Sequence, residues 1–409
     1  MFPRAIESTI REIDGTRFGF LLLGPRQVGK STLIGKAVDD KNIKQKLVFR
    51  LNETRTYFEL QKNPSAIFDT VLAALENGPV LLFIDEVQRI PELLNDCQSL
   101  IDNYGDNITI YLTGSSARKL KGFGVNLLPG RVVLRYLHPL ILPEMTQIQS
   151  EIFPIPIQSA KSSSFSPSLE KLLTFGSLPG IVNQSDTLKM EVLRSYTETY
   201  LQEEIRAEAL SRNIGNFTRL LELVAVESGT IMNVRSLSND SGIPASTISN
   251  YLQILEDTLV LFRLSPYVKN TKKRLMKSPK FIFFDTGVRN ACAGFPLDEQ
   301  VMMKTQAGVL FEQWVFLELR RRMEYMPNQG WSIYYWRTST GVEVDLVLER
   351  NDRLIPIEVK YSTTPQRSDV RHLRSFMKDY TCDKGFLIGR FANIQKLDDG
   401  IFAVPWNRI

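Results

Sequence analysis

The feature that most constrains the fold is a glycine-rich segment at residues 24–31, which reads Gly-Pro-Arg-Gln-Val-Gly-Lys-Ser. It follows a short apolar run at 18–23 and precedes a helix that we expect to begin near Lys30. The two glycines let the backbone wrap tightly around an anion, so that successive N–H groups face it, and the helix N-terminus adds partial positive charge. The spacing G-x-x-x-x-G-K-[ST] in this strand–loop–helix context predicts a phosphate-binding loop within an α/β fold.

ATP and Mg²⁺ are the ligands expected at this loop. The ammonium group of Lys30 can reach the β- and γ-phosphates, and the hydroxyl of Ser31 can bind Mg²⁺. The residues expected to bind the nucleotide are Gly24, Pro25, Arg26, Gln27, Val28, Gly29, Lys30, Ser31 and Thr32. A chance glycine-rich turn is the alternative, and the strand and helix on either side argue against it.

A second motif ends the apolar run at 80–84, where Asp85 and Glu86 follow directly. Asp85 is expected to hold Mg²⁺ through water, and Glu86 is expected to orient and deprotonate the attacking water as a catalytic base. The chain carries one further strand, at 46–52, between the two motifs. That order is typical of P-loop ATPases with a catalytic Glu in this position, which kinases and simple GTPases lack.

The next strand, expected at 108–116, ends in polar residues. Thr113 is the favoured residue to sense the γ-phosphate, with Ser115 second, because this strand is expected to lie between those that end at the two motifs. Arg118 and Arg131 are candidates to neutralise charge in the transition state, either in the same subunit or in a neighbouring one. A plain surface role is the alternative for each arginine.

Six segments together resemble a known family. They are GPRQVGKST, LLFIDEVQRIPELL, LTGSSARKL, LPGRVVLRYLHPL, TFGSLPG and YTETYLQEEI, and they span most of the chain. The chain resembles the bacterial and archaeal AAA+-type ATPases that carry a long C-terminal domain of unknown function. One departure is the pair Glu203 and Glu204, where the family pattern leads us to expect an Arg-Asp or similar pair before Ile205.

The stretch at 216–285 has the order helix, helix–turn–helix and two strands, which predicts a winged helix. Its expected wing is basic and suits contact with a phosphate backbone, through Lys269, Lys272, Lys273, Arg274, Lys277 and Lys280. The start of the second helix offers short polar side chains to a DNA groove, at Ser246, Thr247, Ser249 and Asn250. A role in packing or protein interaction is the alternative.

The last hundred residues predict a separate α/β unit, with a long amphipathic helix at 307–325 followed by strands. Asp345 and Glu358 are expected on neighbouring strands, with Lys360 on the same face as Glu358, and Glu312 on the helix can join them. This constellation resembles the restriction-endonuclease-like fold, in which such residues hold Mg²⁺ and an attacking water at a phosphodiester. The alternative is an inactive nuclease fold. The helix aromatics Phe311, Trp314 and Phe316 are expected in the core rather than as a base-stacking surface.

The expected domains follow from these stretches. They are an AAA+-type P-loop ATPase domain at 1–150, a linker and helical lid at 151–213, a winged-helix domain at 214–295 and a restriction-endonuclease-like domain at 296–409. The linker is expected because residues 151–170 combine prolines with a serine run. The helical lid is expected because helical periodicity continues from about 168 to 228, with Tyr196, Tyr200, Leu201 and Ile205 at helix-like spacing.

Composition narrows the choice of partners. Three scattered cysteines and two distant histidines argue against a disulfide framework, a zinc ribbon and a Ser-His-Asp triad. Neither a signal peptide nor an apolar run of about 18 residues is seen, so we expect a cytoplasmic protein without a membrane segment. A net charge of +5 permits DNA contact without requiring it. Three functions stay open: an ATPase acting on double-stranded DNA, an ATP-dependent switch for a protein partner, and a slow sensor ATPase. A homo-oligomer is compatible with each.

Overall fold

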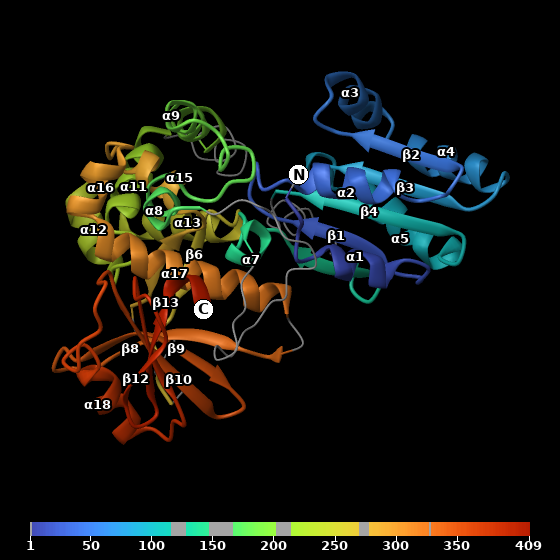
Figure 1. Ribbon diagram of the computed structural model, residues 1–409. Helices are drawn as coiled ribbons and strands as arrows, with labels where there is room; N and C mark the ends of the chain where they lie inside the picture. The colour runs from blue at the N-terminus through green and yellow to red at the C-terminus, as the bar shows by residue number, and fades with distance from the viewer. Residues whose placement is uncertain (1, 116–127, 147–166, 202–213, 270–277, 327–328) are drawn as a thin grey trace. The chain divides into compact units, whose positions relative to one another are not determined.

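A computed structural model describes the chain except residues 1, 116–127, 147–166, 202–213, 270–277 and 327–328 (Figure 1). The chain divides into two compact units. The N-terminal unit comprises Ile6–His138 and Asp257–Val260, and the C-terminal unit comprises Met1–Ala5, Pro139–Glu256 and Leu261–Ile409.

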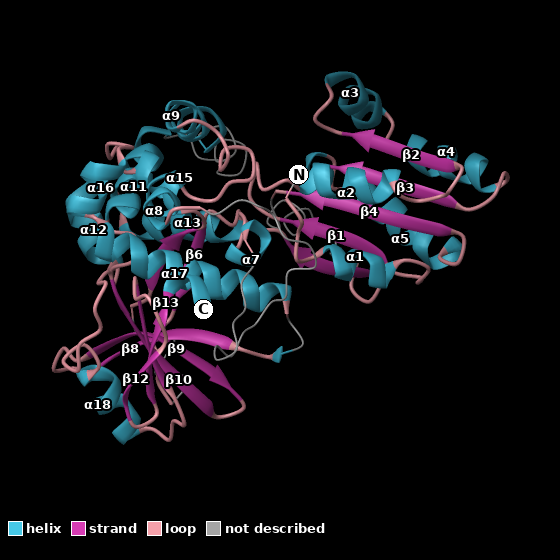
Figure 2. Ribbon diagram, in the orientation of Figure 1, coloured by secondary structure: helices cyan, strands magenta, loops and turns pink. Residues whose placement is uncertain are grey.

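The N-terminal unit is built on a five-stranded parallel sheet in the order β2-β3-β4-β1-β5 (Figure 2). Its strands are β1 (Gly19–Leu23), β2 (Gln45–Arg50), β3 (Val80–Asp85), β4 (Ile108–Gly114) and β5 (Val132–Tyr136). Its helices are α1 (Glu7–Ile13), α2 (Lys30–Asp39), α3 (Thr54–Lys62), α4 (Ala66–Leu75), the 3-10 helix η1 (Val87–Arg89) and α5 (Leu93–Tyr104). The strands predicted at 18–23, 46–52, 80–84 and 108–116, and the helix predicted to begin near Lys30, are confirmed within a few residues.

Both faces of this sheet are covered. Every residue of β1 and of β3 is buried, and the side chains of a strand alternate between the two faces of its sheet. A strand that is buried on both faces must be apolar throughout, which is why these two strands read as continuous apolar runs. The expected order is confirmed: β4 lies between the strands that end at the two nucleotide motifs.

The first part of the C-terminal unit is mainly helical. It contains α7 (Leu142–Met145), α8 (Leu169–Phe175), α9 (Asp186–Ser195), the π-helix η2 (Tyr196–Leu201), α11 (Ile214–Val226), α12 (Val234–Ser241), α13 (Ala245–Asp257), α15 (Thr286–Cys292), α16 (Glu299–Thr305) and α17 (Ala307–Tyr325). The helical periodicity predicted from 168 to 228 is therefore interrupted between α8 and α9, where a turn segment carries Pro179 and Gly180. Much of the predicted linker at 151–170, the pair Glu203 and Glu204, and Ile205 lie outside the described residues.

The elements expected for a winged helix occur in the expected order. Helices α11, α12 and α13 are followed by β6 (Leu261–Leu264) and β7 (Lys280–Phe283), which pair antiparallel. A single bridge joins Ile231 to Lys280. The assignment of this stretch as a winged helix stays a prediction.

A six-stranded mixed sheet completes the C-terminal unit, in the order β12-β13-β11-β10-β9-β8. Its strands are β8 (Ser332–Arg337), β9 (Glu343–Arg350), β10 (Arg353–Lys360), β11 (Gly385–Gly389), β12 (Gln395–Asp398) and β13 (Ile401–Pro405), with helix α18 (Arg371–Asp379) and the 3-10 helix η4 (Trp406–Arg408). Strand β10 pairs antiparallel with β9 and parallel with β11. The long helix predicted at 307–325 is confirmed as α17, and its aromatics Phe311, Trp314 and Phe316 are buried in the core as expected.

The chain beyond β6 is docked on the mixed sheet. Pro266 bridges to Tyr335 of β8, and the backbones of Tyr267 and Tyr335 are hydrogen-bonded. The Tyr267 ring packs in the same apolar cluster as Phe376 and Tyr380. The hairpin and the sheet therefore share one core.

The predicted division into four domains stays a prediction. Among the described residues, no helix combines the length and the apolar character that crossing a membrane requires.

Candidate functional site

The glycine-rich loop joins β1 to α2, as the motif requires. Strand β1 ends at Leu23 and helix α2 begins at Lys30. Gly24 sits where the loop passes very close to the end of β5, because a Cβ atom there would lie 2.2 Å from the carbonyl oxygen of Leu137. Any larger residue at 24 would push the loop away from the sheet. The backbone of Gln27 has φ +63°, a left-handed conformation that is uncommon outside glycine.

Lys30 is buried inside this loop, with 5% of its surface exposed. Its Nζ donates hydrogen bonds to the carbonyl oxygens of Gly24 and Pro25, each at 2.9 Å. The loop therefore holds the ammonium group within its own turn. A fixed cation surrounded by turned backbone is the arrangement that binds phosphate oxygens.

Three polar residues from three different elements meet beside the loop. The hydroxyls of Ser31 and Thr113 both donate to Oδ1 of Asp85, at 2.7 and 2.5 Å. Asp85 is the last residue of β3 and is almost completely buried. Since hydroxyl and carboxylate oxygens are the ligands Mg²⁺ prefers, Ser31 and Asp85 fit a magnesium site. The structure thus brings together the residues predicted for Mg²⁺ and the favoured sensor Thr113.

Glu86 follows Asp85 in a strained conformation, with φ +61° and ψ +44°. Its backbone N–H donates to the Thr113 hydroxyl at 3.1 Å. Its carboxylate Oε2 lies 3.4 Å from Ser115 Oγ and 2.5 Å from Nε2 of Gln88. Sequence reasoning gave no role to Gln88. The sequence signal that could have identified Gln88 is its position two residues after Glu86, at the end of a strand.

Arg131 lies far from the loop in its own subunit. It directly precedes β5, and its carbonyl oxygen accepts from the N–H of Gly19, the first residue of β1, whereas the nucleotide loop follows the last residue of β1. Its guanidinium group is paired with Asp102 at 2.6 Å. A role at its own subunit's phosphates is therefore wrong, because the two lie at opposite ends of the strand. A role toward a neighbouring subunit stays a prediction, and Arg118 lies outside the described residues.

The second predicted constellation is also brought together. Asp345 on β9 and Glu358 on β10 lie on paired strands, and Oδ2 of Asp345 accepts from the N–H of Val359 at 2.8 Å. Lys360 Nζ contacts Glu358 Oε1 at 2.7 Å. Glu358 is buried, and its second oxygen, Oε2, has no hydrogen-bond partner in the structure. Burial, with the nearby charge of Glu358, raises the pKa of Asp345 to about 7.

Glu312 on α17 is committed to another partner. Lys280 Nζ lies 2.9 Å from Glu312 Oε1 and 2.7 Å from Glu343 Oε1. Burial would lower the pKa of Lys280, but the two carboxylates raise it above its usual value. Burial and the neighbouring Asp345 raise the pKa of Glu312 to about 7.

No group of three or more His, Cys, Asp or Glu side chains among the described residues has an arrangement that would hold a metal ion. Asp345 and Glu358 would offer a cation two carboxylates, because the carboxylate of Glu312 is paired with Lys280. The metal role of this pair stays a prediction.

The expected basic wing is wrong at one position. Lys280 is buried and paired with carboxylates, so it cannot contact a DNA backbone. Lys269 is exposed, whereas Lys272, Lys273, Arg274 and Lys277 lie outside the described residues. At the start of α13, Ser246, Ser249 and Asn250 are exposed and Thr247 is half-buried.

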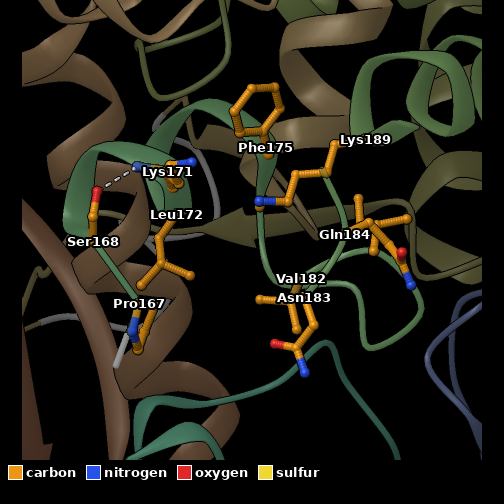
Figure 3. A pocket seen from close by; sticks show the side chains of 11 residues that line it. Pro167, Ser168, Lys171, Leu172, Phe175, Val182, Asn183, Gln184 and Lys189 are labelled. Atoms are coloured by element: carbon orange, nitrogen blue, oxygen red, sulfur yellow. Dashed lines mark hydrogen bonds between the residues drawn. The ribbon is translucent and has the colours of Figure 1, made fainter. Parts of the chain in front are cut away.

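A cavity of about 280 Å³ lies between α8 and α9 (Figure 3). Leu172 and Phe175 contribute apolar surface, and Lys171 and Lys189 line the same cavity. Both lysines are paired with Asp186, at 2.9 and 3.3 Å. The two ammonium groups thus share one carboxylate, and nothing else at this cavity points to a particular ligand.

Three stretches of the chain match known families. Residues 17–146 match the family described as AAA domain, residues 166–299 the family described as Domain of unknown function (DUF8612), and residues 307–409 the family described as Domain of unknown function (DUF4143). The first match covers the parallel sheet and both nucleotide motifs. This part of the chain is therefore similar to an AAA domain.

Relatives of similar length exist in other organisms. An uncharacterized protein of Mycobacterium tuberculosis is 26% identical over 95% of this chain and 80% of its own length, and one of Haemophilus influenzae is 22% identical over 97% and 95%. Among solved structures, the replication initiator DnaA bound to AMPPCP and single-stranded DNA has a TM-score of 0.31 at 14% identity, covering 62% of this chain and 86% of that one. A STAND-type signal-transduction ATPase of Pyrococcus horikoshii has a TM-score of 0.29 at 15% identity, covering 78% and 48%. Neither structural likeness bears on the activity of this chain.

Proposed function

We propose that this protein binds ATP with Mg²⁺ and hydrolyses it at the loop between β1 and α2. The observation that carries the proposal is the convergence of Ser31 and Thr113 on one oxygen of Asp85, with Glu86 adjacent. Lys30, held in the loop at 2.9 Å from two carbonyl oxygens, is the fixed positive charge for the β- and γ-phosphates. Mg²⁺ held by Ser31 and Asp85 would neutralise phosphate charge.

Glu86 is the catalytic base in this proposal. Its carboxylate accepts a proton from the attacking water while the bond between the γ-phosphorus and the ADP oxygen breaks. Thr113 contacts both the Asp85 carboxylate and the Glu86 backbone, so it can couple metal binding at Asp85 to the position of the base Glu86.

Glu86→Gln tests the proposal. The amide keeps the size of the side chain but cannot accept the proton, so ATP affinity should be preserved while phosphate release falls on the order of 10²–10⁴-fold. The same substitution at the exposed Glu59 of α3 is the matched control. Wild-type phosphate release by the Glu86→Gln protein would contradict the assignment of the base.

A second candidate function, in the C-terminal unit, is metal-dependent cleavage of DNA. It is favoured by the adjacency of Asp345, Glu358 and Lys360 and by the buried Glu358 oxygen that has no hydrogen-bond partner. A divalent cation held by the two carboxylates would supply Lewis-acid chemistry, and the Lys360 ammonium would stabilise charge at the phosphodiester. The winged helix predicted at 214–295 would bind the duplex.

The competing function is an ATP-dependent switch for a protein partner, with an inactive nuclease-like fold. Two measurements separate the alternatives: the rate of ATP hydrolysis with and without double-stranded DNA, and nicking of plasmid DNA with Mg²⁺ or Mn²⁺. Stimulation of ATP hydrolysis by DNA favours an ATPase that acts on DNA. Nicking that Asp345→Ala abolishes, with ATP hydrolysis unchanged, assigns cleavage to the C-terminal pair. Absence of both effects favours the switch, or the slow sensor ATPase, which would act in the cytoplasm as monomer or homo-oligomer.

A further inference from the structure

Gln88 makes a specific contact with the proposed catalytic base. It is buried, with 4% of its surface exposed, and lies in the 3-10 helix η1, whose tight turn brings its side chain back toward Glu86. Its Nε2 donates to Glu86 Oε2 at 2.5 Å and to Ser115 Oγ at 2.9 Å. A primary amide has two N–H donors, so these two contacts use both.

The two oxygens of the Glu86 carboxylate have different surroundings. Oε2 accepts a hydrogen bond from Gln88 Nε2 and lies 3.4 Å from Ser115 Oγ. No hydrogen bond to Oε1 is found among the described residues. Because Oε2 is held by donors, the lone pairs of Oε1 remain available to a water molecule. The left-handed backbone of Glu86 adds a further constraint on where its carboxylate points.

The other end of the Gln88 amide indicates what the side chain contributes. Its Oε1 is buried and has no hydrogen-bond partner among the described residues, which lowers stability relative to an apolar side chain of the same size. The amide is enclosed there by Gly114, where a Cβ atom would lie 2.8 Å from Oε1. Packing alone would favour methionine or leucine, so the donor nitrogen is the distinctive contribution of glutamine here.

We propose that Gln88 is the positioning residue for Glu86: its amide holds Oε2 and links it to Ser115, which leaves Oε1 to take the proton of the attacking water. In that step the water oxygen bonds to the γ-phosphorus, the bond from that phosphorus to the ADP oxygen breaks, and the water proton passes to Oε1. The proposal rests on the ATPase function proposed above.

Gln88→Met tests it, because methionine has a similar length and no donor. The kcat for ATP should fall about 10- to 100-fold, as expected when a reacting group is misplaced by about 1 Å. The Kd for ATP should stay within about twofold, since Gln88 contacts the base rather than the loop. Gln61→Met on the exposed face of α3 is the matched control and should leave both values unchanged.

A double substitution distinguishes positioning from a general structural effect. In the Glu86→Gln background there is no base to position, so adding Gln88→Met should change the residual rate little. Gln88→Glu keeps the shape but replaces the donor by an acceptor, and it should reproduce the loss of kcat if the methionine variant folds poorly. ATP affinity reports folding in every variant.

Three outcomes would overturn the proposal. In the first, Gln88→Met retains wild-type kcat while Glu86→Gln is inactive. In the second, Gln88→Met lowers the residual rate of the Glu86→Gln protein as strongly as it lowers the rate of the wild type. In the third, both Gln88 variants lose ATP binding, which would make Gln88 a structural residue. A wild-type protein without ATPase activity is a separate result, which removes the proposed function itself.

Discussion

Removing the buried cation Lys280 should destabilise the C-terminal unit. Lys280 Nζ contacts Glu312 and Glu343 at 2.9 and 2.7 Å, and only 5% of the lysine side chain is exposed, against 28% and 26% for the two glutamates. Lys280→Met keeps the aliphatic part of the side chain, removes the cation beside the partly buried Glu312 and leaves Glu343 only the pairing with Arg337 at 3.5 Å. The magnitude therefore depends on how much water each carboxylate retains.

Breaking a fully buried ion pair costs roughly 3–5 kcal/mol. Because about a quarter of each glutamate remains in water, solvent screens part of this effect, and we expect a loss of about 2–4 kcal/mol in the free energy of unfolding. Loss of the Lys280 contact with the Tyr335 ring, at 5.2 Å, acts in the same direction.

Tryptophan fluorescence reports the unfolding of the C-terminal unit. All four tryptophans of the chain, Trp314, Trp331, Trp336 and Trp406, belong to the C-terminal unit. Urea denaturation followed by their emission therefore reports this unit and not the N-terminal unit. The exposed Lys269→Met serves as the matched control and should change the free energy by less than about 0.5 kcal/mol.

The triple variant Lys280→Met, Glu312→Gln, Glu343→Gln tests the cause. Removing the uncompensated charges as well should restore part of the lost stability. The reasoning is refuted if Lys280→Met matches Lys269→Met, or if the triple variant is less stable than Lys280→Met alone.

Three further predictions address the nucleotide site and the acidic cluster. Lys30→Ala should abolish ATP–Mg²⁺ binding in calorimetry, because the point charge at the phosphates is lost, and unchanged affinity would contradict the loop assignment. Arg131→Ala should impair ATP hydrolysis only if subunits complete each other's sites. In that case, mixing the Arg131→Ala protein with the Lys30→Ala protein should restore activity. The absence of rescue, together with a monomeric mass in ATP, argues against a shared site. Burial raises the pKa of Glu312 to about 7, so its stabilising contribution is complete below its usual pKa near 4.5 and is lost as the pH rises to about 7. Tryptophan-monitored stability should therefore fall across that window, and fall less in Glu312→Gln.

The residues that meet at the candidate nucleotide site could be predicted almost completely from the chain. Lys30, Asp85 and Glu86 each follow directly from a short motif, because a phosphate loop needs glycine, lysine and a hydroxyl at set spacing. Thr113 could be predicted because the apolar strands and their order imply a parallel sheet whose carboxyl ends meet at one edge. Asp345 and Glu358 were expected on neighbouring strands, and strand alternation placed Lys360 on the face of Glu358.

What the chain could not reveal concerns side chains that meet through tertiary packing. The partners of Arg131 and Lys280 lie 29 and 32 or more residues away in the sequence, so no local pattern distinguishes an ion-paired arginine or a buried lysine from a solvated one. Lys280 was expected to contact DNA because it lies in a basic run. Only the packing of β7 against α17 and β9 shows that its ammonium group is paired with Glu312 and Glu343.

The sequence by itself determined the class of the N-terminal domain and the residues at its phosphate loop, because anion binding depends on local backbone turns and on residues adjacent along the chain. The tertiary structure alone decided that Ser115 joins Gln88 at one oxygen of Glu86, and that Arg131 faces away from its own nucleotide site. The physical reason is that hydrogen bonds and ion pairs depend on distance in space, to within a few tenths of an ångström, and strand order and helix packing set that distance.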